Sequence, residues 1–347
     1  MAVSATGCMQ WDYAATSGDD DFNLSGRDGH FVVCEGNFQY GNASLSFIGS
    51  DGTTLNNIFN QVNDMKLGDV AQSMSIVNGN VAWICVNNSN VVFAVDANTL
   101  RERGRITTGL TSPRYIHFVS PTKAYVTQLW GNCIAIVNTA TYTVSGYITV
   151  PDMSSTRGST EQMVQIDDKV YVSCWSYNNR IIRIDVGTDS VDASVNVGVQ
   201  PRSLVKDCHN RLWTLTDGGY EGNPTGHEAP KLVCLSAPNL KMQQSITFTL
   251  NDQCGSLTTN AAADSIYWFR GADLWAMSVD DTTAPTEPYI ANVASQPYAL
   301  TVDQTGIYVA NAGDYRRSGQ VYRFIGRTPV DTFTVGINPT AIVRKQP

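Results

Sequence analysis

Charged residues are scarce in this chain of 347 residues: they make up 16% of the sequence, and the net charge is -8. Lysine and arginine form no cluster. Because proteins that bind nucleic acid present a basic surface, this composition argues against nucleic acid as a partner. Long apolar runs are also missing, and none approaches the roughly 18 residues that a membrane-spanning helix needs. No long amphipathic helix is evident either.

Motifs for metal binding and catalysis are missing as well. The four histidines and eight cysteines show no zinc-type spacing and no Cys-x-x-Cys pair. There is no nucleophile elbow and no phosphate-binding loop. We therefore assign no catalytic residue, no metal ligand and no cofactor, and predict that the chain is not an enzyme. Most of the cysteines are expected to be small buried core residues.

What the sequence does contain is a repeat. An aromatic residue leads a short β-branched or apolar run seven times, at steps of 52, 42, 46, 42, 54 and 41 residues. A period of roughly 40–50 residues, built from strands and turns, is the size of one four-stranded propeller blade. The pattern predicts an all-β fold, a seven-bladed β-propeller. The seven leading residues are Phe31, Trp83, Tyr125, Tyr171, Trp213, Tyr267 and Tyr308.

The fourth repeat shows the unit most clearly. Strands are predicted at 162–166, 170–175, 180–185 and 191–197, with Gly, Asp and Asn in the turns between them. The first repeat lacks a first strand, whereas 337–343 reads as a first strand with no second strand after it. We expect this C-terminal segment to complete blade one and remove two open sheet edges. Residues 22–347 would form the propeller, with the sixth blade the most irregular.

The two faces of such a ring differ in this sequence. Turns between first and second strands, and between third and fourth strands, are short and plain; we call their side the plain face. Loops between second and third strands, and the segments between blades, form the loop-rich face. The longest of these loops covers 217–230. Aromatic residues beside amides and charged groups on one face suit the binding of a polar ligand.

Residues 1–21 are predicted to be a flexible tether. Within them, Ala5-Thr6-Gly7-Cys8 is similar to the end of a bacterial lipoprotein signal, with Cys8 as the lipid attachment site. A plain N-terminal leader is the alternative interpretation.

The loop sequences resemble those of a known family. Segments 35–43, 67–72, 112–116, 159–163, 174–177 and 216–222 are similar to the YncE-like (DUF5074-type) β-propeller surface lipoproteins of Bacteroides, in particular to those that capture vitamin B12. The resemblance spans the chain from Phe31 to Val343. It implies a lipid-anchored protein at the cell surface, on the outer membrane. It also implies that the protein binds cobalamin or another corrinoid as a ligand and docks on a TonB-dependent transporter of the BtuB type.

On its own the protein is expected to be a monomer. The ligand-binding residues expected from the loop-rich face are Phe38, Tyr40, Gln72, Arg114, Trp130, Glu161, Gln162, Trp175, Tyr177, Asn178, Arg202, Asp217, Tyr220, Glu221, Tyr315 and Arg316.

Aromatic side chains of this set would cover the corrin ring or stack on the nucleotide base, and an arginine, Arg114, Arg202 or Arg316, would approach the phosphate. Two alternatives stay open. The same loops suit an adhesin or a surface-layer-type module that binds protein or glycan. Glu35, Glu161, Asp217 and Glu221 together would suit a metal-dependent hydrolase.

Overall fold

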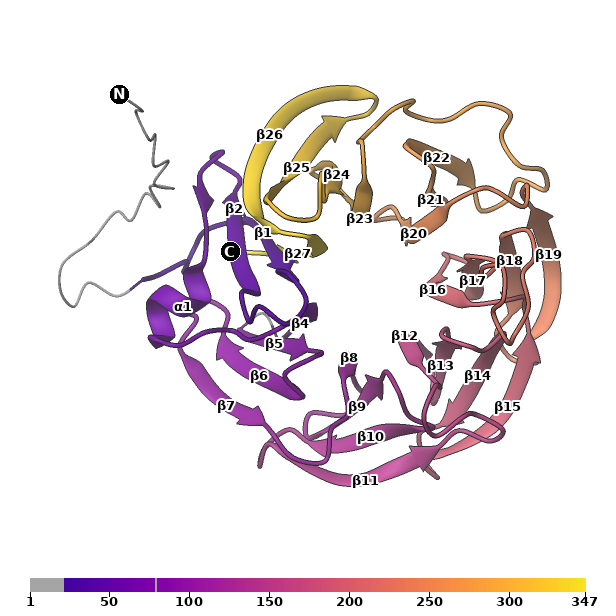
Figure 1. Cartoon of the computed structure of the whole chain (residues 1–347), viewed down its shortest axis with the longest axis horizontal. Helices are drawn as coiled ribbons and strands as arrows, with labels where there is room; N and C mark the ends of the chain where they lie inside the picture. The colour runs from indigo at the N-terminus through magenta and orange to yellow at the C-terminus, as the bar shows by residue number, and fades with distance from the viewer. Residues whose placement is uncertain (1–21, 79) are drawn as a thin grey trace, which may run out of the picture.

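Seven antiparallel sheets stand in a closed ring around a common axis in the computed structural model, which describes residues 22–78 and 80–347 (Figure 1). The predicted seven-bladed β-propeller is confirmed. Six blades have four strands and the sixth has three. The predicted tether and Cys8 lie outside the described residues.

The strands are given from the innermost outward: blade one has β27 (Pro339–Lys345), β1 (Gly29–Cys34), β2 (Ser44–Gly49) and β3 (Thr54–Leu55), and blade two has β4 (Ala71–Val77), β5 (Val81–Val86), β6 (Val91–Asp96) and β7 (Glu102–Ile106). Blade three has β8 (Pro113–Phe118), β9 (Lys123–Gln128), β10 (Cys133–Asn138) and β11 (Thr143–Thr149), blade four has β12 (Thr160–Ile166), β13 (Lys169–Cys174), β14 (Arg180–Asp185) and β15 (Ser190–Asn196), and blade five has β16 (Pro201–Lys206), β17 (Arg211–Thr216), β18 (Lys231–Ser236) and β19 (Lys241–Thr247). Blade six has β20 (Cys254–Thr259), β21 (Ser265–Arg270) and β22 (Asp273–Ser278), and blade seven has β23 (Pro297–Asp303), β24 (Gly306–Asn311), β25 (Ser318–Ile325) and β26 (Thr328–Ile337).

The repeated aromatic residues all fall on the second strand of their blade, as the period predicts. Six of the seven are buried, and Tyr267 is half-buried. They belong to apolar clusters that fill the space between neighbouring blades, such as the one that joins Trp213 and Leu232 to Ile266 and Trp268. Because a large aromatic side chain buries extensive apolar surface, one anchor per blade gives the ring a continuous core.

The C-terminal strand closes the ring. β27 pairs antiparallel with β1, from Gly29 opposite Lys345 to Cys34 opposite Pro339. The first and last strands, β1 and β27, thus belong to one sheet (Figure 1). This confirms the predicted completion of blade one.

Blade six departs from the pattern because residues 279–296 do not form a full fourth strand. The outer edge of β22 is instead covered locally. Leu274 and Ile290 exchange backbone hydrogen bonds of 2.9 and 3.0 Å. The Asp281 carboxylate accepts from the backbone N–H of Ser278 at 3.0 Å. These contacts cover part of the edge that would otherwise be open to strand pairing.

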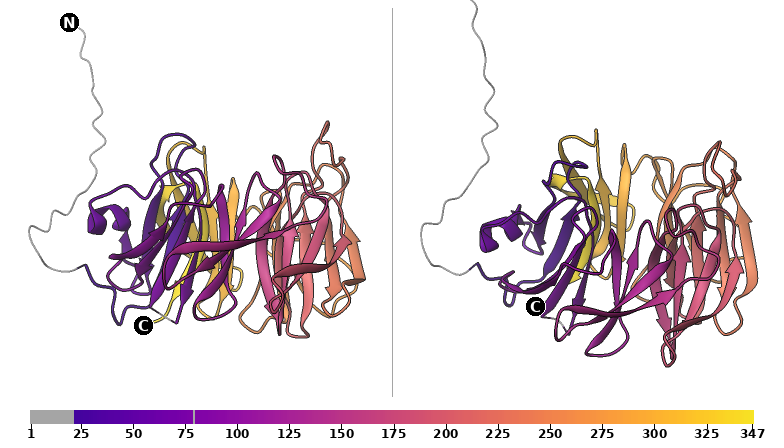
Figure 2. Two further views of the ribbon diagram at one scale, coloured as in Figure 1. Left: turned by 90° about the horizontal axis from the view of Figure 1, so that it is seen from below. Right: turned by 60° about the horizontal axis from the view of Figure 1, so that its bottom comes forward.

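A short helix, α1 (Ile58–Asn63), packs on the outer side of blade one, where β3 has only two residues. Its Phe59 lies 5.1 Å from Phe93 of blade two, between ring centroids. No helix among the described residues is long and apolar enough to cross a membrane. Seen from the side, the strands run between two opposed faces of a disc (Figure 2).

Candidate functional site

A β-bulge recurs at the same place in all seven blades. In each inner strand the register shifts within the first residues, at the end nearest the loop-rich face. Each shift leaves one extra residue on the inner strand, and bulges of this kind redirect side chains. They place a ring of mostly polar residues at the inner edge of the loop-rich face, here called the mouth. These residues are Gln72, Arg114, Glu161, Arg202, Ser256, Tyr298 and Thr340.

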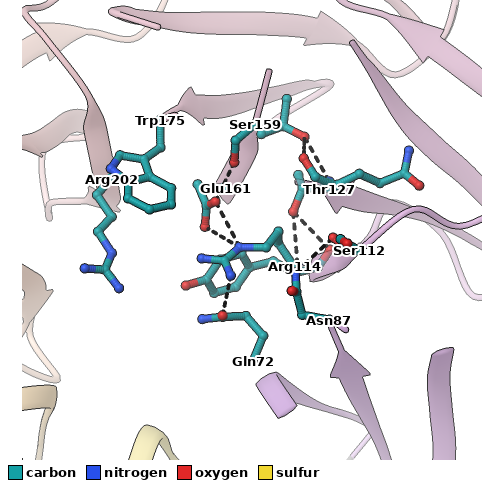
Figure 3. Close-up of polar contacts among 12 residues, drawn as sticks. Gln72, Asn87, Ser112, Arg114, Thr127, Ser159, Glu161, Trp175 and Arg202 are labelled. Carbon is teal, nitrogen blue, oxygen red and sulfur yellow. Dashed lines mark hydrogen bonds and ion pairs between the residues drawn. The ribbon is translucent and has the colours of Figure 1, made fainter. Parts of the chain in front are cut away.

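Arg114 and Glu161 form a buried ion pair at this mouth (Figure 3). The Arg114 side chain is 7% exposed and that of Glu161 is 0% exposed. Nε of Arg114 donates to both carboxylate oxygens at 2.9 and 3.1 Å, and its Nη1 donates to the Gln72 side chain. Ser159 donates to the same carboxylate at 2.6 Å. Burial disfavours the charged guanidinium, but the adjacent Glu161 carboxylate outweighs it and raises the pKa of Arg114.

Trp175 lies beside this pair, and a second arginine, Arg202, lies over its ring. The guanidinium carbons of Arg202 and Arg114 lie 5.4 and 5.9 Å from the Trp175 ring centroid, within the range of cation–π attraction (Figure 3). The indole N–H donates to Asp217 at 2.7 Å, which fixes the ring plane. Trp175 is half-buried, whereas Arg202 is exposed.

Asp217 is held at the start of the longest loop. Its carboxylate also accepts from the Gln200 amide at 3.2 Å and from the Gly219 N–H at 2.9 Å. Gly218 and Gly219 have φ of 79° and 75°, so the chain turns sharply just after the carboxylate in a conformation that glycine adopts without strain. Burial raises the pKa of Asp217, against the lowering effect of these donors.

Exposed aromatic side chains lie on the same face as the mouth. Six Phe, Tyr or Trp side chains are exposed in the described part of the chain, and five of them lie in loop-rich-face loops; Tyr147, on β11, is the sixth. Monomeric proteins seldom expose such groups together on one side without a function. The five are Phe38, Tyr40, Trp130, Tyr220 and Tyr315.

The family model described as "Domain of unknown function (DUF5074)" matches residues 28–315. The chain belongs to the DUF5074 family. A search of curated proteins by sequence finds no match.

Among solved structures, this DUF5074 protein is similar to the periplasmic gluconolactonase PpgL of Pseudomonas aeruginosa, with TM-score 0.67, 10% identity, and 92% of this chain and 99% of that chain covered. A functionally unknown protein from Desulfotomaculum acetoxidans DSM 771 gives TM-score 0.65 at 11% identity, with 92% and 99% covered. Hydrazine synthase of Kuenenia stuttgartiensis gives 0.60 at 13% identity, with 78% and 88% covered. Identities this low show the shared fold alone.

The prediction that the chain is not an enzyme is wrong, because catalysis is not excluded for this fold. Two of these neighbours, a gluconolactonase and a hydrazine synthase, bear enzyme names on the same propeller fold. Missing catalytic motifs carry little weight here, because a propeller site is assembled from residues distant in sequence. The neighbours do not make this DUF5074 protein an enzyme.

The remaining predicted residues fall into two groups. Tyr177 and Tyr220 meet through their hydroxyls at 3.2 Å, and Glu221 and Arg316 are exposed. Two others are engaged within the protein. The Gln162 side chain accepts from the Leu204 N–H of the next blade at 2.9 Å, and Asn178 is buried and accepts from the Asn179 N–H at 2.9 Å.

Tyr298 is a residue of the mouth that sequence reasoning missed. Its hydroxyl donates to Glu35 at 2.7 Å, and its ring meets Tyr315 edge-on at 5.9 Å between centroids. A signal was present, since Tyr298 follows Pro297 just as Arg114 and Arg202 follow Pro113 and Pro201. The residue after the proline is the one that the bulge redirects.

The acidic residues considered as a metal site have separate partners. Glu161 pairs with Arg114, Asp217 with Trp175, and Glu35 with Tyr298. Within residues 22–78 and 80–347, no group of three His, Cys, Asp or Glu side chains is placed to share a metal ion.

Proposed function

We propose that this DUF5074 propeller captures a corrinoid, cobalamin, on its loop-rich face and passes it to a TonB-dependent outer-membrane transporter of the BtuB type. In this it would act like BtuG, the vitamin B12-capture protein of Bacteroides that its loop sequences resemble most. A propeller of this family fits a binding or structural role. The proposal gives that role a ligand and a destination.

The observation that carries the proposal is the shared location of the polar mouth and the exposed aromatic side chains. Trp175 sits at the mouth, and the exposed Phe38, Tyr40, Trp130, Tyr220 and Tyr315 are in loops on the same face. A corrinoid is a broad macrocycle that is fringed with amides and carries a phosphate and a nucleotide base. Its apolar surface suits aromatic side chains, and its amides suit the surrounding amide and backbone groups.

The scaffold favours tight capture because it is rigid before the ligand arrives. The inner residues of the mouth are held by hydrogen bonds between blades, such as Ser73 to the Arg114 carbonyl at 2.6 Å. Little conformational entropy then has to be lost on binding. In the proposed arrangement Cys8 carries the lipid that keeps the protein at the cell surface, and the corrinoid lies between the propeller and the transporter.

The first test is titration of the purified protein with cyanocobalamin, followed by heat and by tryptophan fluorescence. We expect saturable one-to-one binding at nanomolar or tighter strength. Absence of binding up to about millimolar, where the interaction is worth only about -4 kcal/mol, would reject the proposal. An adhesin would then be the better interpretation of the same face.

Variants locate the site. Trp175→Ala and Tyr220→Ala should each weaken capture by about 1–3 kcal/mol, the range for a stacked aromatic contact, without a large change in melting temperature. Ile325→Ala is a matched control, since Ile325 is exposed at the β25–β26 turn of the plain face. Unchanged affinity in both aromatic variants would show that the ligand binds elsewhere.

A further inference from the structure

The acidic side chains at the mouth already accept hydrogen bonds from other residues of the protein. Glu161 is bound by Arg114 and Ser159, and Asp217 accepts three hydrogen bonds from Trp175, Gln200 and Gly219. Glu35 accepts from the Tyr298 hydroxyl at 2.7 Å. None of these carboxylates needs a further cation, and each is held in place by its donors.

Arg202 is in the opposite situation. It is exposed, and no Asp or Glu of the described chain lies within the 4.0 Å of an ion pair with it. Its one close side-chain contact given by the structure is the face of Trp175, at 5.4 Å from the ring centroid. Figure 3 shows its side chain beside Trp175, with the guanidinium apart from the Arg114–Glu161 pair.

The position of Arg202 in the mouth is also visible in its longer-range effects. Its positive charge opposes the rise in the pKa of Asp217 and of Tyr298, both of which burial raises. These two residues belong to blades five and seven. The guanidinium therefore acts on one group of its own blade and on one group of blade seven.

The other two candidate arginines are less suited to an anion. Nε of Arg114 is occupied by Glu161, and the whole side chain is nearly inaccessible. Arg316 is exposed on the β24–β25 loop, where its neighbour Arg317 pairs with Asp314 at 3.5 Å. Of these three arginines, Arg202 alone combines an exposed side chain with an aromatic platform, Trp175, at the mouth.

We infer that Arg202, seated on Trp175, is the subsite for the single anionic group of the ligand. A guanidinium presents paired N–H groups that match the oxygens of a phosphate, and stacking on an aromatic ring holds it flat. The inference rests on the proposed function: in a corrinoid, the group is the phosphate of the nucleotide loop, with the ring system over the surrounding aromatic side chains.

Two corrinoids test the inference directly. Cobalamin carries the phosphate and the base, whereas dicyanocobinamide has the same macrocycle without them. Affinities of both are measured by calorimetry for the native protein, for Arg202→Met, which keeps an apolar stem on Trp175, and for Arg202→Lys. Arg317→Met is the control, since it removes a positive charge on the same face from a side chain that is 89% exposed.

Arg202→Met should weaken cobalamin binding about tenfold or more, the usual loss for a charge-assisted hydrogen bond, and leave cobinamide binding unchanged. Arg202→Lys should retain part of the affinity for cobalamin, and Arg317→Met should leave the ratio between the two corrinoids as in the native protein. Equal losses for both ligands in Arg202→Met, or no loss for either, would overturn the subsite. Failure of the native protein to bind either corrinoid would instead reject the proposed function.

Discussion

At the scale of single residues, Arg114 and Glu161 acquire a role that their positions in the sequence do not reveal. Both are predicted to contact ligand, because they belong to loop segments of the rich face. In the structure the two side chains bind each other and are almost completely buried. Each charge is tolerable in that setting only because the other is present. They hold the mouth together and position Trp175, against which Arg114 lies.

Breaking this pair should therefore cost far more stability than breaking a surface pair. Arg114→Met or Glu161→Gln should lower the free energy of unfolding by about 3–5 kcal/mol, because an unpaired or unsatisfied group stays buried. The double variant Arg114→Met/Glu161→Met should recover much of that loss. Urea unfolding of the four proteins provides the measurement.

Arg103→Met is the matched control for these variants. Arg103 pairs with Asp96 near the surface, and its side chain is 41% exposed. Exposed pairs contribute about 0–1 kcal/mol. Single variants at Arg114 and Glu161 that lose no more than this control would show that the buried pair does not hold the site.

At the scale of elements, the strands were predictable but the bulges were not. Alternation and the aromatic period place the strands of blade four within two residues of those observed, for example 180–185 and Arg180–Asp185. A bulge depends on the register between two strands, and this register is set by packing across the sheet rather than by local sequence. Arg114 and Arg202 were therefore expected at the site only as residues of the loop-rich face. Tyr298 was missed, although it too follows a proline at the bulge of its blade.

The plain face is also more elaborate than its short turns predict. Its seam between blades seven and one holds a hollow of about 240 Å³ that His30, Arg323 and Arg344 help to line. His30 on β1 bonds Asp303 on β23 at 2.8 Å, and Arg344 on β27 bridges Asp303 and Asp28. The seam thus joins the closing strand to its neighbour by ion pairs as well as by apolar contacts.

This seam should weaken in acid. Burial opposes ionisation of Asp303, but hydrogen bonds from His30 and Thr305 outweigh it and hold the pKa of the carboxyl well below its usual range. A lowered pKa contributes stability above the unfolded value of about 3.9, and that stability is lost as the pH falls below it. Unfolding free energies of the native protein and of Asp303→Asn should differ at neutral pH, and the difference should shrink steadily as the pH falls below about 4 towards the lowered pKa of Asp303. A constant difference across this range would contradict the assignment.

At the scale of the whole molecule, closure by β27 makes the site possible. Residues between 35 and 340 meet at one mouth only because the ring is complete, and one sheet joins the strands β1 and β27. Removal of residues 339–347 would expose β1, in which all six residues are buried. An uncovered apolar strand edge invites pairing with other chains.

The truncated protein should consequently lose cooperative unfolding and aggregate, whereas removal of only the exposed Gln346 and Pro347 should leave the melting temperature nearly unchanged. Size-exclusion chromatography and circular dichroism on heating distinguish the two. A synthetic peptide of residues 337–347, added during refolding, should restore a monomer if the strand acts as a separate clasp. A truncated chain that stays monomeric with the native melting temperature would show that the other six blades hold the ring without it, and that the mouth does not depend on closure.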